Sequence, residues 1–297
     1  MFVDKLKDKN VKFNKIDEKT AELITQNEFS QYRLLCLSNV FDKYTKTENA
    51  GKYINLDFAQ LYYLSKLDEK LSHILIQICL ELELKMKTLL ICDANKLGVS
   101  NAFLVDYIKD DFEFLSQSYL QELNCILESA EKGYDGFALE RFLDIAMFGT
   151  FEKIVRAFYK RYSGQLMEEK IGIYDGYLIS IHNLRNKVAH NIPLLGDLHI
   201  KGKAFNSRLS AYLVKSGIKN KTLHTNLSRE VEYDIVNVLY FYCCIQDRKR
   251  IITIYRQLKE FCRECKQYAK YLINNSILVS TFNFFERIIK IFRRPVA

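Results

Sequence analysis

Residues that break helices are scarce in this 297-residue chain: Pro193 and Pro295 are its two prolines, and glycine occurs 11 times. Long stretches without such breakers favour helices over a many-stranded β architecture. No hydrophobic run approaches the ~18 residues that a membrane-spanning helix needs. The N-terminus, Met1 to Lys5, is charged at once and has no apolar signal-peptide core. We therefore expect an all-α, cytoplasmic protein that does not span a membrane.

The chain also lacks the signatures of several enzyme classes. It has no glycine-rich phosphate loop, no GxSxG nucleophile elbow and no HExxH zinc motif. Among its eight cysteines, Cys262 and Cys265 form a CxxC pair, but no second CxxC completes a zinc site. Most of the others lie within apolar helical patterns, which is typical of small buried side chains in a reducing compartment. We expect no metal site and no cofactor.

Hydrophobic periodicity predicts helices along most of the chain. Residues 1–55 suit short helices and loops, one of which starts after an N-cap at Asp17 and runs to about Gln26. From Leu56 to Lys96, apolar residues recur at intervals of three and four, which predicts one long amphipathic helix. Gly98 is a suitable stop signal after it.

Further helices are expected over 111–131, over 137–162 with a break at Gly149, and over 228–272. Another helix should begin at 175–176 and end before Pro193 and Gly196. The region 197–226 is expected to be irregular. The chain has no internal repeat, low-complexity segment or flexible linker. The simplest account is one compact helical unit with an N-terminal lobe (1–55), a core (56–200) and a C-terminal extension (201–297).

Basic residues outnumber acidic ones, giving a formal net charge of +8. This excess suits a polyanionic partner such as RNA, and it equally suits a solubilising surface charge. The cations between 248 and 270 fit an RNA-backbone track or a solvated helix face. The basic, aromatic tail over 281–297 fits packing on the domain, packing on a second subunit, or association with a membrane surface.

One predicted helix combines a fixed cation, an amide and a titratable imidazole within about two turns. The residues are Arg185, Asn186, Lys187, Val188, Ala189 and His190. The apolar positions of this helix predict a buried stripe of Tyr177, Ile181, Leu184 and Val188. The opposite face carries His182, Asn183, Asn186 and His190, with Arg185 at its border. We expect these polar side chains to point toward solvent or a partner.

These residue types suit RNA cleavage without a metal. His190 lies in the last helical turn, where the dipole favours a cation, and histidine both takes and gives protons near neutral pH. Arg185 offers a planar fork for phosphate oxygens, and Asn186 can orient the imidazole. On an ideal helix Arg185 and His190 are ~140° apart, so they do not share a face. A two-fold dimer with facing helices would remove this difficulty.

Two alternatives stay open for this helix. An arginine and a histidine at this spacing arise by chance in many sequences, and a histidine near a helix end is often only a cap. His182, one turn before Arg185, is a further candidate for the site.

Residues 185–190 resemble the RNxxxH motif of the HEPN superfamily, and the wider chain resembles the bacterial Abi-like (abortive infection) family within it. Phe29 to Leu34 resembles an early YYRL-type segment of that family. Leu61 to Leu90, which includes Asp68, resembles its long charged helix, and Phe148 to Phe151 resembles its FGT element. The resemblance covers roughly residues 1–200.

The resemblance implies a HEPN-type helical bundle that forms a homodimer through the motif helices. It also implies a toxin-like, metal-independent endoribonuclease that leaves a 2′,3′-cyclic phosphate and a 5′-hydroxyl. In this role His190 is the acid and base, Arg185 binds phosphate and Asn186 supports both. The sequence leaves open what restrains such an activity: a protein antitoxin, a small-RNA antitoxin or a phage-derived signal. Asn191 to Leu194 depart from the family pattern, which has another histidine there, and a non-catalytic RNA- or partner-binding module is the alternative.

Overall fold

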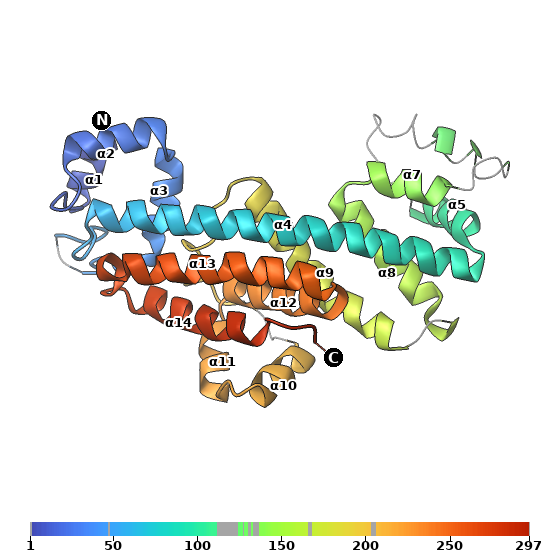
Figure 1. Ribbon diagram of the computed structural model, residues 1–297. Helices are drawn as coiled ribbons and strands as arrows, with labels where there is room; N and C mark the ends of the chain where they lie inside the picture. The colour runs from blue at the N-terminus through green and yellow to red at the C-terminus, as the bar shows by residue number, and fades with distance from the viewer. Residues whose placement is uncertain are drawn as a thin grey trace. The chain divides into compact units, whose positions relative to one another are not determined.

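A computed structural model describes residues 2–46, 48–111, 124–126, 128–129, 132, 137–165, 168–202 and 206–296 of the chain (Figure 1). Extended pairing within these residues is limited to isolated bridges, Lys12 with Asp57, Lys43 with Tyr53 and Lys201 with Arg229. The all-α prediction is confirmed. None of the helices described is both long enough and apolar enough to cross a membrane.

The chain forms two compact units. The first unit combines Met1–Cys79 with Asn183–Ala297, and the second consists of Leu80–His182. Helices α4 (Phe58–Leu97) and α9 (Glu168–Ala189) each contribute residues to both. The three consecutive segments expected from the sequence, 1–55, 56–200 and 201–297, stay a prediction.

The first unit contains the beginning of α4, the end of α9 and most of the remaining helices. These are α1 (Phe2–Asp8), α2 (Glu18–Asn27), α3 (Gln31–Leu37), the 3₁₀ turn Ser38–Val40, α10 (Ser207–Lys215), α11 (Asn220–Leu227), α12 (Glu230–Ile245), α13 (Arg248–Leu272) and α14 (Ser276–Ile291). Helix α13 lies along the first part of α4, where Tyr63 stacks on Tyr268 and Tyr271 (Figure 1).

The second unit contains the rest of α4 and α9 with three further helices and a 3₁₀ turn. These are α5 (Ser100–Asp111), α7 (Ala138–Ile145), α8 (Phe148–Arg161) and the 3₁₀ turn Ser163–Gln165. Its core is aromatic, with Phe103 packed edge-on against the ring of Phe158. The tyrosine hydroxyl of Tyr159 donates to Asp93 of α4 at 3.0 Å, which ties α8 to that helix.

Several predicted helix ends are confirmed. Asp17 caps α2 by accepting the backbone N–H of Thr20 at 3.0 Å. Helix α4 ends at Leu97, and Gly98 follows with a φ of +67°, a left-handed conformation that glycine adopts readily.

Other boundaries were wrong. The motif helix begins at Glu168 rather than near 175, and the break expected at Gly149 lies at 146–147, before α8. The region 197–226, expected to be irregular, contains α10 and α11. Most of the helix expected over 111–131 lies outside the described residues.

The long helix expected over 228–272 is two helices, α12 and α13. They are separated at Gln246 and Asp247, because the Asp247 carboxylate accepts the backbone N–H groups of Lys249 and Arg250 at 2.8 and 3.0 Å. An aspartate N-cap starts a new helix here without the help of proline or glycine.

Candidate functional site

The residues of the motif, 185–190, lie at the C-terminal end of helix α9, where backbone hydrogen bonds terminate the helix. The predicted stripe of Tyr177, Ile181, Leu184 and Val188 is buried. After the helix, Asn191 takes a left-handed φ of +54°, and its N–H donates to the carbonyl of Val188 at 3.1 Å. The N–H of Ile192 donates to the carbonyl of Lys187 at 2.9 Å. This pair of bonds is a Schellman motif, and it makes His190 the C-cap residue of α9.

The three predicted site residues differ in exposure. The His190 side chain is exposed, whereas Arg185 and Asn186 are half-buried. The backbone N–H of His190 donates to the carbonyl of Asn186 at 3.1 Å, so His190 stands one turn beyond Asn186 on the same side of the helix. The last carbonyl groups of α9 favour positive charge at this position.

Two neighbours on the same face do not point freely outward, contrary to expectation. The amide of Asn183 donates to the carboxylate of Asp234 in α12 at 3.3 Å. In the second unit, Nδ1 of His182 lies 2.6 Å from Oε2 of Glu152 in α8. Both side chains therefore have packing roles that the helical pattern alone did not reveal.

A buried carboxylate holds the backbone that follows the motif. Oδ1 of Asp68, in α4, accepts the N–H groups of Leu194 and Leu195 at 2.8 and 2.7 Å. Oδ2 of Asp68 lies 2.5 Å from Nη2 of Arg33 in α3. The other terminal nitrogen of Arg33 reaches the carbonyl of Asn191 at 3.5 Å. We call this arrangement, Arg33 and Asp68 with the backbone of 191–195, the Asp68 clamp.

The electrostatics of the clamp are governed by burial. The Asp68 side chain is fully buried, and this desolvation raises its pKa to about 6. The Arg33 charge and the two backbone hydrogen bonds act in the opposite direction but do not cancel the effect. At pH 7 the Asp68 carboxyl is mostly ionised and faces the arginine as a charged pair.

The loop that follows His190 also packs closely on α3. A side chain at Gly196 would overlap the backbone carbonyl of Cys36, so this position requires glycine. Lys187 of α9 reaches Asp197 at 3.4 Å and ties the helix end to the same loop. The segments around Arg33 and Asp68, which resembled family elements separately, thus meet at the loop after the motif.

The FGT element begins α8 in the second unit and lies against His182. The ring of Phe148 is 5.5 Å from the imidazole of His182, and a Cβ added to Gly149 would lie 3.6 Å from that imidazole. Glu152, one turn later, binds both His182 and Arg156, the latter at 2.9 Å. Glu152 was not among the residues predicted from the sequence, because its partner His182 is 30 residues away.

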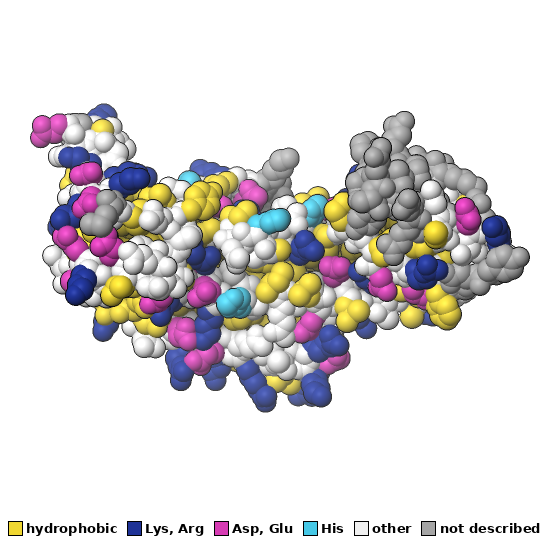
Figure 2. Space-filling model, turned by 90° about the horizontal axis from the view of Figure 1, so that it is seen from above, with side chains coloured by type: hydrophobic (Ala, Val, Ile, Leu, Met, Phe, Trp, Pro, Cys, Tyr) yellow, Lys and Arg dark blue, Asp and Glu magenta, His cyan; other side chains and the backbone are white. Residues whose placement is uncertain are grey.

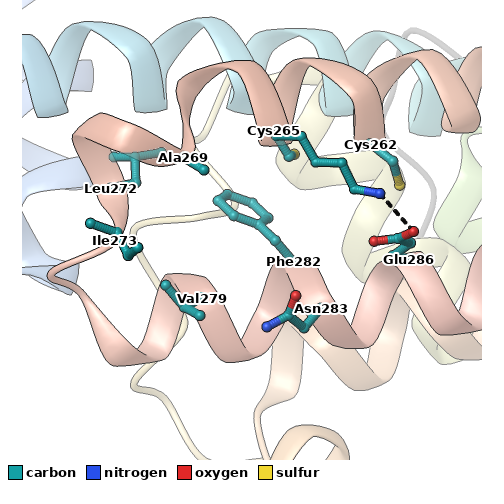
Figure 3. A pocket seen from close by; sticks show the side chains of 10 residues that line it. Cys262, Cys265, Ala269, Leu272, Ile273, Val279, Phe282, Asn283 and Glu286 are labelled. Carbon is teal, nitrogen blue, oxygen red and sulfur yellow. Dashed lines mark hydrogen bonds and ion pairs between the residues drawn. The ribbon is translucent and has the colours of Figure 1, made fainter.

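The CxxC pair lies in an apolar setting. Cys262 and Cys265 line a hollow of about 150 Å³ between α13 and α14, and Phe282 projects into it from α14 (Figure 3). Burial raises the pKa of Cys262 to about 11 and that of Cys265 further, so both thiols are protonated at neutral pH. Within the described ranges, no three His, Cys, Asp or Glu side chains are arranged to hold a metal ion.

The fold and the site define an all-α protein with an exposed histidine at the C-cap of a helix that buries one apolar stripe, and with a buried carboxylate holding the next loop. A family model described as Abi-like protein matches residues 27–195, more than half of the chain. The chain therefore belongs to the Abi-like family. The matched span includes the whole Asp68 clamp and the motif, whereas α10 to α14 lie beyond it. No curated protein and no solved structure shows significant similarity to the chain.

Proposed function

We propose that the protein is a metal-independent endoribonuclease with a toxin-like role in abortive infection. The exposed imidazole of His190, one turn beyond Asn186 and close to Arg185 in sequence, carries this proposal. Membership of the Abi-like family supports the abortive-infection role. Arg185, Asn186 and His190 are the proposed site residues.

The chemistry needs one proton carrier and one fixed cation. The imidazole of His190 takes the proton of the RNA 2′-hydroxyl, and the 2′-oxygen attacks the neighbouring phosphorus. Arg185 stabilises the added negative charge on the phosphate oxygens. The proton then passes to the 5′-oxygen as its bond to phosphorus breaks. The products are a 2′,3′-cyclic phosphate and a 5′-hydroxyl.

The proposed site is shared between two copies of the chain. On a regular helix, residues five positions apart lie ~140° apart around the axis, so Arg185 and His190 of one copy face different directions. In a homodimer that joins the C-terminal ends of two α9 helices, Arg185 of one copy and His190 of the other can contact one phosphate. Asn186 lies between them on the same helix.

The first experiment measures RNA cleavage in EDTA by the wild-type protein, His190→Ala and Arg185→Ala. We expect cleavage to fall by about 10²–10⁴-fold in His190→Ala, because the proton carrier is lost. His199→Ala is the matched control, since His199 is an exposed histidine in a loop outside the motif. Equal cleavage by wild type and His190→Ala, or cleavage abolished by EDTA, would overturn the proposal.

A second experiment tests the shared site by mixing the two inactive variants. A heterodimer of Arg185→Ala with His190→Ala contains one site with both native residues, so random exchange should restore about a quarter of wild-type cleavage. No recovery in dimers shown to have exchanged would contradict the shared site. The role of His190 in cleavage, which the first experiment tests, would not be affected by that result.

The second candidate function is a non-catalytic RNA-binding module. The exposed cations Arg248, Lys249, Arg256 and Lys259 on α13 favour it. Other cations of this helix are engaged, such as Arg263 with Glu260. On the face shown in Figure 2, acidic side chains lie among basic ones over much of the surface, and several basic side chains line its lower edge.

If the protein is a non-catalytic RNA-binding module, RNA should co-purify with it uncleaved, and its affinity for RNA should fall steeply as the salt concentration rises. Charge reversal at Lys249 and Arg256 should weaken that binding, with Lys5→Glu, another exposed lysine, as the control. Unchanged binding after the α13 reversals would exclude this helix as the RNA track.

A further inference from the structure

Helix α14, which forms most of the basic tail, has two different faces. Its apolar side chains Phe284, Phe285, Ile288 and Ile289 are buried, so the tail packs within the first unit. Its cations Arg287 and Lys290 are exposed and line a hollow of about 420 Å³ between α14 and α11. This volume lies within the range of small-molecule sites, roughly 300–1,000 Å³. We call it the α11–α14 hollow.

The lining of this hollow is polar on both sides. Asn226 of α11 is 2% exposed; its amide donates to the carbonyl of Thr222 at 2.8 Å, and its Oδ1 accepts the hydroxyl of Ser280 at 3.2 Å. The Ser280 oxygen therefore keeps its lone pairs for a donor. A buried amide thus fixes a hydroxyl from α14 at the wall, which suits a ligand with hydroxyl groups of its own.

The charge balance of the hollow favours an anion. Glu286 is bound by Lys266 of α13 at 2.8 Å (Figure 3). It is also bound by Lys290 at 2.9 Å, so two cations already compensate it. Among the described residues, no carboxylate pairs with Arg287. Two cations, Arg287 and Lys290, therefore line the hollow with one carboxylate, and the arginine fork is available for phosphate oxygens.

We propose that the α11–α14 hollow binds a ribose phosphate, either as a free nucleotide or as one unit of an RNA strand. Arg287 and Lys290 bind the phosphate, while Glu286 and the Ser280 oxygen accept hydrogen bonds from ribose hydroxyls. The assignment is independent of the motif on α9. It uses helices beyond the span matched by the family.

The test is calorimetric titration of the full-length protein with AMP, adenosine and a five-nucleotide RNA. We expect AMP to bind and adenosine to bind far more weakly, because only AMP carries phosphate. Arg287→Gln should weaken AMP binding roughly tenfold or more. Arg293→Gln, a change at an exposed arginine of the same tail that does not line the hollow, should leave it unchanged.

The outcomes separate the two sources of ribose phosphate. If the pentamer binds through Arg287 while AMP does not, the site accepts a strand rather than a free nucleotide. The proposal would be overturned if AMP and adenosine both bound with equal affinity, if neither phosphate ligand bound, or if wild type and Arg287→Gln bound the phosphate ligands equally. AMP should bind to His190→Ala as it does to wild type, because His190 does not line the hollow, so failure here is distinct from failure of the proposed nuclease.

Discussion

Two buried carboxylates of the first unit, Asp68 and Glu232, pair with arginines in different ways. Asp68 meets Arg33 from another helix and two backbone N–H groups more than 120 residues away in sequence. Glu232 meets Arg229, three residues earlier, at 3.1 and 3.2 Å. Arg229 also donates to the hydroxyl of Thr281 in α14 at 3.2 Å. One pair therefore joins distant segments, and the other belongs mainly to one helical turn.

The two pairs share their electrostatics but not their consequences. Both side chains are fully buried, and desolvation raises the pKa of Asp68 to about 6 and that of Glu232 to about 7. The charge pair alone is thus a weak source of stability in either place. Asp68 adds two backbone hydrogen bonds that position the loop after His190. We infer that Asp68 supports both stability and the candidate site, whereas Glu232, with Arg229 and Thr281, supports the packing of α12 on α14.

The largest expected effect comes from Asp68→Ala. The change removes the carboxylate that faces the Arg33 charge and leaves two buried N–H groups without an acceptor, so the free energy of unfolding should fall by about 3–5 kcal/mol. RNA cleavage per folded molecule should also fall, because the loop that follows His190 is released. Urea unfolding gives the first quantity, and cleavage corrected for the folded fraction gives the second.

Glu232→Gln is the matched control for Asp68→Ala. It keeps the size of a buried side chain and should leave cleavage per folded molecule unchanged. If Asp68→Ala, once corrected for folding, cleaved RNA as fast as wild type does, the positioning role of the clamp would be wrong. The two carboxylates would then be equivalent structural groups.

The free energy of unfolding of wild type should depend on pH in a way that Glu232→Gln does not share. This effect should be somewhat smaller than the loss of stability in Asp68→Ala. The folded pKa of Glu232, about 7, exceeds its ordinary value of 4.5, so the folded state keeps a proton that the unfolded chain releases. The resulting stability is fully present below about pH 4.5 and is lost as the pH rises through 7. This contribution is about 3 kcal/mol. Glu232→Gln, which cannot titrate, should lack it.

The measurement is the free energy of unfolding of wild type minus that of Glu232→Gln, from pH 4 to pH 9. We expect the difference to decline steadily up to about pH 7 and then level off. A difference that rises with pH would mean that the Arg229 pair lowers the pKa of Glu232, contrary to the dominance of burial.

Sequence periodicity predicted local features well and distant contacts poorly. The stripe of α9 and the caps at Asp17 and Gly98 depend on neighbouring residues, and they were found. The cap at Asp247 is also local, and attention to aspartate as a helix start would have found it. The contact between Asp68 and Leu194 spans 126 residues, and no short-range pattern encodes it.

The candidate site was predictable only in part for the same reason. The position of His190 at a helix end follows from the sequence, since Pro193 excludes a longer helix. The pairing of His182 with Glu152 and of Asn183 with Asp234 depends on which helices pack against α9. A helical wheel gives the face of a residue but not the neighbour that covers that face.

The smallest expected effect concerns the surface counterpart of the clamp, the pair of Lys187 and Asp197 at 3.4 Å. Both side chains are partly exposed, so Lys187→Met should change the free energy of unfolding by at most about 1 kcal/mol. The pair joins the same helix end to the same loop as the Asp68 clamp does. If the clamp alone positions the loop, Lys187→Met should keep wild-type cleavage at low and high salt. A loss of cleavage as large as that of Asp68→Ala would show that the loop depends on the charged surface as well as on the buried carboxylate.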